Sequence, residues 1–107
     1  MQLTIPERLV LFNILPQKGA FSTMRAVQEL HMGLSLTEEE RAQIGYREDE
    51  KGAHWDMALD VDIPLSVEAY RVAKETLEAL DKKAEVGPEH VSLYEKFVEA
   101  RALVAVS

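Results

Sequence analysis

Apolar positions along this chain follow a helical rhythm at both ends and an alternating rhythm in the middle. In residues 1–35 and 67–107 they recur three and four positions apart, which is the spacing of one face of a helix. In residues 46–63 the rhythm is that of a strand, and the clearest alternation of apolar and acidic residues is Leu59, Asp60, Val61, Asp62 and Ile63. An extended segment there has one apolar and one anionic face, so the pattern predicts helical blocks on either side of a small β region.

Residues that favour helix ends place the first helix between Thr4 and Pro16. Thr4 and Glu7 have the spacing of a capping box, and Pro6 falls in the first turn, where its missing N–H costs nothing. Pro16 ends the helix because the residue before a proline is disfavoured in the helical conformation.

Two further helices are expected before the β region. Ser22 or Thr23 can cap the second helix, and Gly33 suits the left-handed position just past its end. Thr37 begins a third, short helix, because Glu40 stands at the capping-box position that follows it.

The β region is expected to be an antiparallel hairpin followed by one more strand. Residues 46–49 and 53–57 form the hairpin, and Gly52 supplies the positive φ that a tight turn requires. Residues 58–63 form a further strand or continue the second one. Pro64 stops this strand because proline cannot donate to a sheet ladder.

The C-terminal block is expected to contain two helices. Ser66 caps the fourth helix, and Leu65 and Tyr70 are spaced as a hydrophobic staple across that cap. Gly87 and Pro88 break the chain before the fifth helix. The inward positions are expected to be Val67, Tyr70, Ala73, Leu77 and Leu80 in the fourth helix and Val91, Tyr94, Phe97 and Val98 in the fifth.

These elements predict an α+β fold with three N-terminal and two C-terminal helices around a small antiparallel hairpin or sheet. Three helices followed by a hairpin is also a winged-helix-like element order. A chain of 107 residues is one domain by size, so residues 1–107 are expected to form a single domain, in which residues 99–107 are a flexible or packed tail. The expected core is Leu9, Phe12, Val27, Leu30, Leu59, Val61, Ile63, Tyr70, Leu77, Leu80, Tyr94 and Phe97.

Composition is that of an ordinary folded protein without disulfides. Hydrophobic residues make up 47% of the chain and cysteine is absent, which excludes disulfides, thiolate metal sites and thiol catalysis. No signal peptide and no run of about 18 apolar residues is visible, so neither secretion nor membrane insertion is expected. We therefore expect a cytoplasmic protein.

Negative charge concentrates in the middle of the chain. Of the net charge of −7, residues 36–66 carry −6, from three basic and nine acidic side chains. Affinity for DNA depends largely on Lys and Arg at phosphates, and the third helix begins instead with acidic residues, so direct DNA binding is not expected. A small basic patch elsewhere is offered only by Arg8, Lys18 and Arg25.

Patterns typical of metal binding or catalysis are sparse. His54 with Asp56, and Asp60 with Asp62, share strand faces and could bind a divalent cation, but they match no calcium loop and we interpret them as solvent-facing. The histidines are far apart in sequence, and His90 is expected to be exposed. No nucleophile elbow or glycine-rich phosphate loop is present, so we expect neither enzymatic activity nor a cofactor.

A protein-binding surface is the leading interpretation of the β region. Tyr46, Trp55 and Met57 are residue types enriched at interfaces, and here they lie among charged residues. Trp55 has two interpretations: it anchors the hairpin against the helices, which we favour, or it contacts a partner. The surrounding carboxylates suit a basic partner.

The sequence therefore predicts a small acidic, non-enzymatic protein that binds another protein, with an apolar helix face as a route to a homodimer. The alternative is a nucleic-acid mimic or a winged-helix-type regulator of transcription. The candidate partner-binding residues are Glu48, Asp49, Glu50, Trp55, Asp60 and Asp62.

Three segments carry a resemblance to a known group of proteins. They are LTIPERLVLFNILP over residues 3–16, Trp55-Asp56, and LYEKF over residues 93–97. In order and spacing, up to about Val98, the chain resembles a group of small uncharacterised phage and prophage proteins. The group has no assigned activity, so the resemblance implies no functional residue. It implies an accessory protein of a virus or mobile element in a bacterial cytoplasm, where such acidic proteins often bind a host protein.

Overall fold

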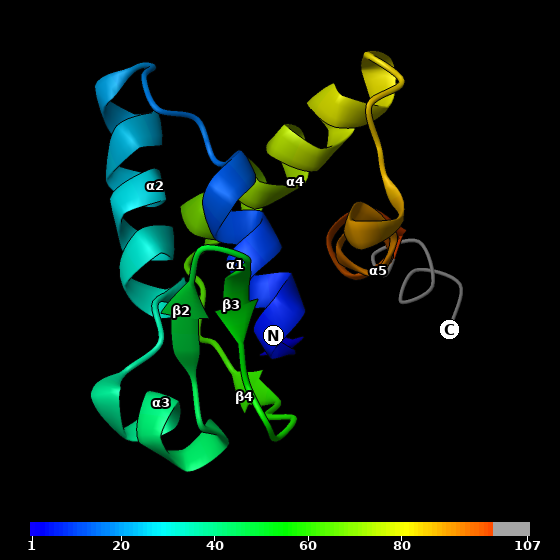
Figure 1. The fold of residues 1–107 in the computed structure, drawn as a ribbon. Coiled ribbons are helices and arrows are strands. Elements are labelled where there is room, and N and C mark those ends of the chain that lie inside the picture. The colour runs from blue at the N-terminus through cyan, green and yellow to red at the C-terminus, as the bar shows by residue number, and fades with distance from the viewer. Residues whose placement is uncertain (100–107) are drawn as a thin grey trace, which may run out of the picture.

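Three helices build the N-terminal half of the fold, which is α+β as predicted (Figure 1). The computed structural model describes residues 1–99. The three helices are α1 (Ile5–Ile14), α2 (Phe21–Leu34) and α3 (Glu38–Ile44). The predicted capping box of α1 is confirmed, because the Glu7 amide donates to Thr4 Oγ1 over 3.3 Å and the Thr4 amide donates to Glu7 Oε1 over 2.9 Å. The same reciprocal pair joins Thr37 and Glu40 at the start of α3.

Helix α2 starts earlier and ends later than the sequence predicted. Its N-cap is Ala20, which makes no side-chain hydrogen bond, so neither Ser22 nor Thr23 caps the helix. Gly33 lies inside the last turn and not past the end. A Cβ at Gly33 would lie 3.2 Å from Ile63 Cγ2, so glycine at this position allows Ile63 to approach the helix closely.

The predicted hairpin is confirmed, although it is shorter than expected. Strands β2 (Arg47–Asp49) and β3 (Gly52–His54) pair antiparallel. Gly52 has a φ of 117° in the turn, and Gly45, with a φ of 71°, ends α3 in the left-handed conformation. Residues 55–60 are irregular, so the prediction of strand over this stretch is wrong.

A second two-stranded sheet joins the start of the chain to its middle. Strand β1 (Gln2–Leu3) pairs antiparallel with β4 (Val61–Asp62), and the Ile63 amide donates to the Met1 carbonyl over 2.8 Å. The predicted strand over residues 58–63 is thus reduced to two residues, and it belongs to a different sheet from the hairpin. A two-residue strand carries no alternation of its own, so the pattern of β1 could not identify it as the pairing partner.

The C-terminal half consists of one long helix and a short compound one. Helix α4 (Val67–Lys82) starts at its predicted cap, where the Ser66 hydroxyl accepts a hydrogen bond from the Ala69 amide over 3.1 Å. The uniform fifth helix that was predicted is replaced by the 3-10 turn η1 (Pro88–His90), the α-helical turn α5 (Val91–Tyr94) and the π-helical η2 (Glu95–Glu99). Beyond Glu99, the predicted tail lies outside the described residues.

Buried side chains of all the longer helices meet in one core, which also takes Leu3 from β1. Five of the expected core residues are buried: Val27, Leu30, Ile63, Leu77 and Phe97. Six others are only half-buried: Leu9, Leu59, Val61, Tyr70, Leu80 and Tyr94.

Three apolar residues that were expected to face inward are exposed instead. Phe12 is 37% exposed, Val67 is 84% exposed and Val91 is 48% exposed. The apolar faces of these helices are wide, and a wide face does not fix which of its edges turns inward. In α1 the fully buried apolar positions are Ile5 and Leu11, and in α4 they are Ala69, Ala73 and Leu77.

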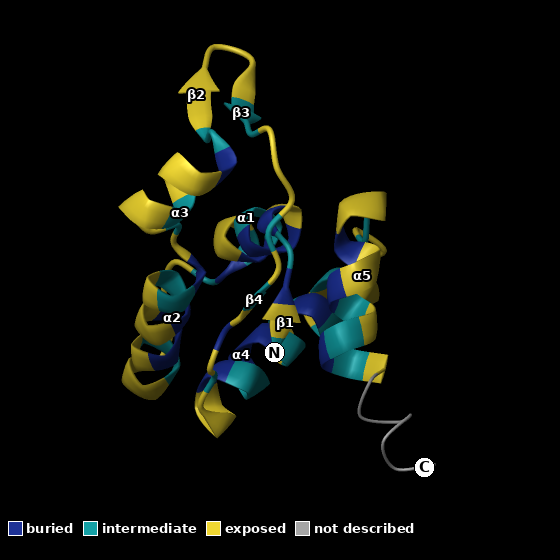
Figure 2. Ribbon diagram, turned by 90° about the horizontal axis from the view of Figure 1, so that it is seen from below, coloured by how far each residue is buried: buried dark blue, intermediate teal, exposed yellow. Residues whose placement is uncertain are grey.

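Burial is uneven across the molecule (Figure 2). Buried residues gather between the helices, whereas β2 and β3 contain no buried residue. Within residues 1–99, no helix is long and apolar enough to cross a membrane.

Candidate protein-interaction surface

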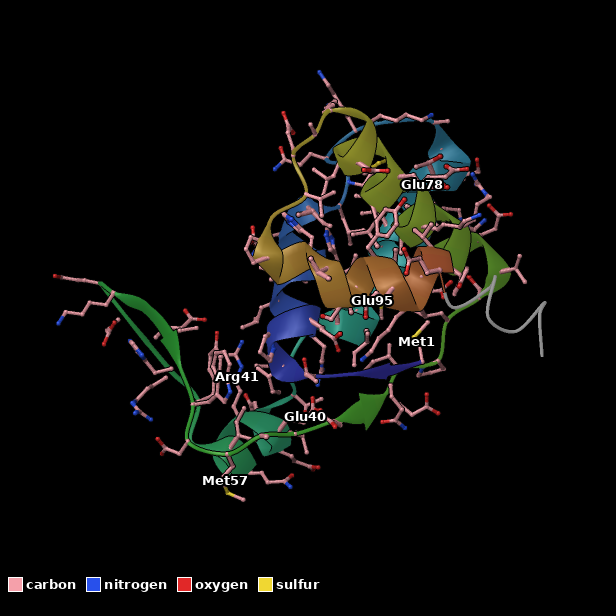
Figure 3. All side chains as sticks on the ribbon, turned by 90° about the vertical axis from the view of Figure 1, so that its right-hand side faces the viewer. Met1, Glu40, Arg41, Met57, Glu78 and Glu95 are labelled. Atoms are coloured by element: carbon pink, nitrogen blue, oxygen red, sulfur yellow. The ribbon has the colours of Figure 1, made fainter. Side chains whose placement is uncertain are left out.

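The β2–β3 hairpin projects from the helical body and carries half of the predicted binding residues (Figure 3). Glu48 and Asp49 end β2, Glu50 begins the turn, and all three side chains are exposed. The structure therefore places these three consecutive carboxylates together on one solvated projection, as the hairpin prediction required.

Hydrogen bonds fix the base of the hairpin to the end of α3. The Asp56 amide donates to the Ile44 carbonyl over 2.7 Å, and Arg47 Nη1 donates to the Gly45 carbonyl over 2.9 Å and to Asp56 Oδ1 over 3.1 Å. A Cβ on Gly45 would lie 2.6 Å from Asp56 Oδ2, so this close approach requires glycine. Together these contacts set the position at which the hairpin leaves the helical body.

Arg41, Tyr46 and Trp55 stack at the base of the hairpin. The Tyr46 and Trp55 ring centroids are 6.4 Å apart with 10° between the ring planes, and the Arg41 guanidinium carbon lies 5.2 Å from the Tyr46 centroid. A cation–π contact at an exposed site contributes about 0.5–1 kcal/mol. Trp55 is half-buried, so it packs at the hairpin base and still presents part of its surface to solvent.

Cations neutralise part of the acidic middle of the chain. Four of its nine carboxylates lie within ion-pair distance of a cationic group, the pairs being Glu40 with Arg8, Asp56 with Arg47, Asp62 with the N-terminal amine, and Asp49 with His54 when the imidazole is protonated. The other five form no ion pair with residues 1–99, and they are Glu38, Glu39, Glu48, Glu50 and Asp60. The free negative charge therefore lies mainly on the first turn of α3 and on the hairpin.

Asp60 and Asp62 do not join the carboxylates of the hairpin. Asp62 lies in β4, where its Oδ1 accepts a hydrogen bond from the N-terminal amine over 2.6 Å. Asp60 precedes β4 and lines a hollow of about 270 Å³ together with Trp55 and Pro6. The predicted site is split because the strand that was expected to connect its two parts pairs with the N-terminal strand instead.

Arg8 was expected in a small basic patch, and this prediction is wrong. Its side chain is 2% exposed, and it donates to both carboxylate oxygens of Glu40 over 2.8 and 3.1 Å and to two backbone carbonyls at the end of α2. The hydrogen bond from Arg8 is the main cause that lowers the pKa of Glu40 to about 2, against the opposing effect of burial. Its position three residues after Ile5 and three before Leu11, on the buried face, is a signal that could have identified this role.

Two of the histidines have structural roles. His90 was expected to be exposed, but it is 8% exposed and its Nδ1 accepts a hydrogen bond from the Gly87 amide over 2.9 Å. His31 lies against Phe12, with 4.4 Å between the ring centroids. Among residues 1–99, no group of three or more His, Asp or Glu side chains is placed to hold a metal ion.

A groove of about 330 Å³ lies between the hairpin, α1 and the junction of α2 with α3. Its apolar lining is Leu9, Phe12, Leu34, Leu36 and Ala53, and its polar lining is Asn13, Ser35, Arg41, Tyr46 and Glu48. The Tyr46 hydroxyl donates to Glu48 Oε1 over 2.8 Å. Burial, and next this contact with Glu48, raise the pKa of Tyr46, so the phenol remains a donor at neutral pH.

In comparisons with known proteins, no family model, no curated protein and no solved structure matches this chain. The interpretation of the surface therefore depends on its own geometry and charge.

Proposed function

We propose that this protein is a non-enzymatic binding protein that uses the β2–β3 hairpin and the first turn of α3 to bind a basic surface on a protein partner. The observation that carries this proposal is the excess of exposed negative charge on α3 and the hairpin that follows it. Between residues 38 and 56, six carboxylates are exposed but only three Lys or Arg side chains are.

The hairpin supports this role because little of it contributes to the core. β2 and β3 contain no buried residue, so their sequence is not constrained by packing. An excess of exposed carboxylates attracts cationic partners at long range and speeds association. Trp55 and Arg41 at the hairpin base are residue types that dominate the binding energy of many interfaces.

We further propose a bacterial cytoplasm as the setting in which the partner is met, the setting implied by the expected resemblance to phage and prophage proteins. A bacterial lysate is therefore the source of partner for the first experiment.

The test compares a charge reversal on the hairpin with an equal charge reversal elsewhere on the surface. The hairpin variant carries Glu48→Lys, Asp49→Lys and Glu50→Lys, and the matched control carries the same change at three exposed residues on η2 and after α4, namely Glu85, Glu95 and Glu99. Circular dichroism should show both variants folded, because each exposed substitution changes stability by only about 0.5 kcal/mol.

The tagged wild-type protein and the control are expected to recover the same partner from the lysate, and the hairpin variant to recover about tenfold less, because like charges across an interface repel. Equal recovery by the hairpin variant and the control would contradict the proposed function.

Nucleic-acid mimicry is a second candidate, favoured by the order of elements. Three helices followed by a hairpin is the winged-helix-like order, and this chain presents carboxylates where a DNA-binding protein presents cations. A mimic should lose affinity for its target steeply as salt is raised, whereas an interface dominated by apolar contacts should respond little. Because binding of the acidic hairpin to a basic surface is also weakened by salt, competition with duplex DNA for the purified target distinguishes a mimic from the function proposed above.

A further inference from the structure

We propose that the groove between the hairpin, α1 and the α2–α3 junction receives one bulky apolar side chain of the partner, from a segment in which a Lys or Arg stands close to that side chain. This inference rests on the proposed function, because it specifies the part of the partner that lies beside the acidic hairpin.

The lining of the groove suits an apolar side chain. Phe12 is 37% exposed on α1, and Leu9, Leu36 and Ala53 beside it are half-buried. The His31 ring packs on Phe12 and limits where the phenyl ring can move. A volume of about 330 Å³ is near the lower limit of about 300 Å³ for ligand sites, so the groove fits one side chain better than a large ligand.

Contacts on both sides hold the groove in shape without a partner. Arg8 Nε donates to the Leu34 carbonyl over 3.1 Å, and Arg8 Nη2 donates to the Ser35 carbonyl over 2.8 Å. Leu34 and Ser35 both line the groove, so the buried arginine fixes this wall. The hydrogen bonds between the hairpin base and the end of α3 fix the other wall. A preformed site loses less entropy on binding than one that must be ordered first.

Glu48 gives the groove its preference for a cation. Its carboxylate is held at the groove by the Tyr46 hydroxyl over 2.8 Å, and it forms no ion pair with residues 1–99. Arg41 also lines the groove, with its guanidinium over the Tyr46 ring, so the lining itself carries one charge of each sign. The preference for a cation comes from the surplus of exposed carboxylates on the hairpin, and a Lys or Arg of the partner is expected beside Glu48, on the hairpin side of the groove.

The experiment uses a displayed library of random peptides as the probe and the full-length protein as the target. Peptides enriched over a bare surface are synthesised with a fluorescent label, and their affinity is measured by anisotropy. We expect a consensus with one aromatic or large aliphatic residue and a Lys or Arg within a few positions of it.

Two matched pairs of variants locate the binding. Phe12→Ala is expected to weaken binding about tenfold, whereas Phe21→Ala, which removes a more exposed phenyl ring away from the groove, should leave it unchanged. Glu48→Gln keeps an acceptor for the Tyr46 hydroxyl and removes the charge, so binding should weaken about two- to fivefold. Glu50→Gln, outside the groove lining, should have less effect.

Each other result overturns the inference. Enrichment of peptides without a basic residue contradicts the role of Glu48, and equal affinities for Phe12→Ala and Phe21→Ala contradict the groove. A library that yields no enriched peptide also overturns it. If the triple charge reversal on the hairpin lowers capture of the partner about tenfold while Phe12→Ala leaves capture unchanged, the proposed function stands and only the groove inference fails.

Discussion

Among single residues, Arg8 has a structural role that the sequence prediction missed, although its place on the buried face of α1 could have indicated it. One side chain connects α1 to the end of α2 and, through Glu40, to the first turn of α3. The same Glu40 carboxylate accepts a hydrogen bond from the Thr37 amide in the capping box. The ion pair between Arg8 and Glu40 and the start of α3 therefore depend on one another. A buried charge is tolerated only when its hydrogen bonds are satisfied, and here a bidentate pair and two carbonyls provide this.

Replacing Arg8 with methionine is expected to lower the free energy of unfolding by about 3 kcal/mol, because it leaves Glu40 without its cation in a largely buried position. Urea unfolding of Arg8→Met and Arg25→Met, followed by circular dichroism, measures the difference. Arg25 is exposed and forms no ion pair with residues 1–99, so its variant is the control. Similar midpoints for the two variants would show that the buried pair contributes no net stability.

The pH dependence of stability provides a second measure of this pair. The pKa of Glu40 is about 2 in the folded protein and 4.5 as an ordinary glutamate, so the folded state favours the carboxylate. Its stabilising contribution is complete above about pH 4.5 and is lost as the pH falls towards 2. The Glu40→Gln variant cannot titrate at this position. Its free energy of unfolding should therefore fall less steeply over that interval than that of the wild type.

At the scale of elements, the sequence predicted what local signals determine. The capping boxes at Thr4 and Thr37 and the turn glycine Gly52 are defined within a few residues, and all three are confirmed. The pairing of β1 with β4 is a contact between distant residues, and two-residue strands have no period to detect. The split of the candidate site between the hairpin and Asp60 follows from that pairing, so it could not be predicted either.

Lys96 links η2 to β1 and α1. Its Nζ lies 2.6 Å from Glu7 Oε1 and 2.8 Å from the Gln2 carbonyl. Lys96→Met is expected to cost about 1–3 kcal/mol, because Glu7, which is 5% exposed, loses its cation. Lys74→Met on α4 is the control, since Lys74 is half-buried and forms no ion pair with residues 1–99. Thermal unfolding that ranks the two variants equally would contradict the importance of this link.

The pH dependence of stability tests the contact between Lys96 and Glu7 a second time, through the carboxylate of Glu7. Burial would raise the pKa of Glu7, but hydrogen bonds from Lys96, Thr4 and Ser92 outweigh it and lower the pKa below the ordinary value of 4.5. Wild-type stability therefore decreases as the pH falls below that value, because the folded state then loses a favoured carboxylate. Without Lys96 the pKa of Glu7 rises, so the Lys96→Met variant should lose less stability on acidification than the wild type.

At the scale of the whole molecule, the fold separates a core of helices from a surface that the core does not need. Leu30 of α2 and Leu77 of α4 are fully buried and belong to one hydrophobic cluster, whereas no residue of β2 or β3 is buried. A segment with few buried contacts opens at a lower free energy than the core. Among hydrogen-bonded amides, those of β2 and β3 should therefore exchange with solvent fastest, and those of Leu30 and Leu77 slowest.

Hydrogen exchange followed by NMR tests this ranking, and adding the captured partner extends it to function. A partner bound at the hairpin suppresses local opening of the hairpin, so amide exchange in β2 and β3 should become slower. The amides of Leu30 and Leu77 exchange through global unfolding, so their exchange should slow only to the extent that binding stabilises the whole fold. Protection confined to the outer faces of α2 and α4 would place the partner elsewhere. In the free protein, the hairpin amides could instead exchange as slowly as those of the core. That result would mean that the hairpin unfolds only together with the core and belongs to the same cooperative unit.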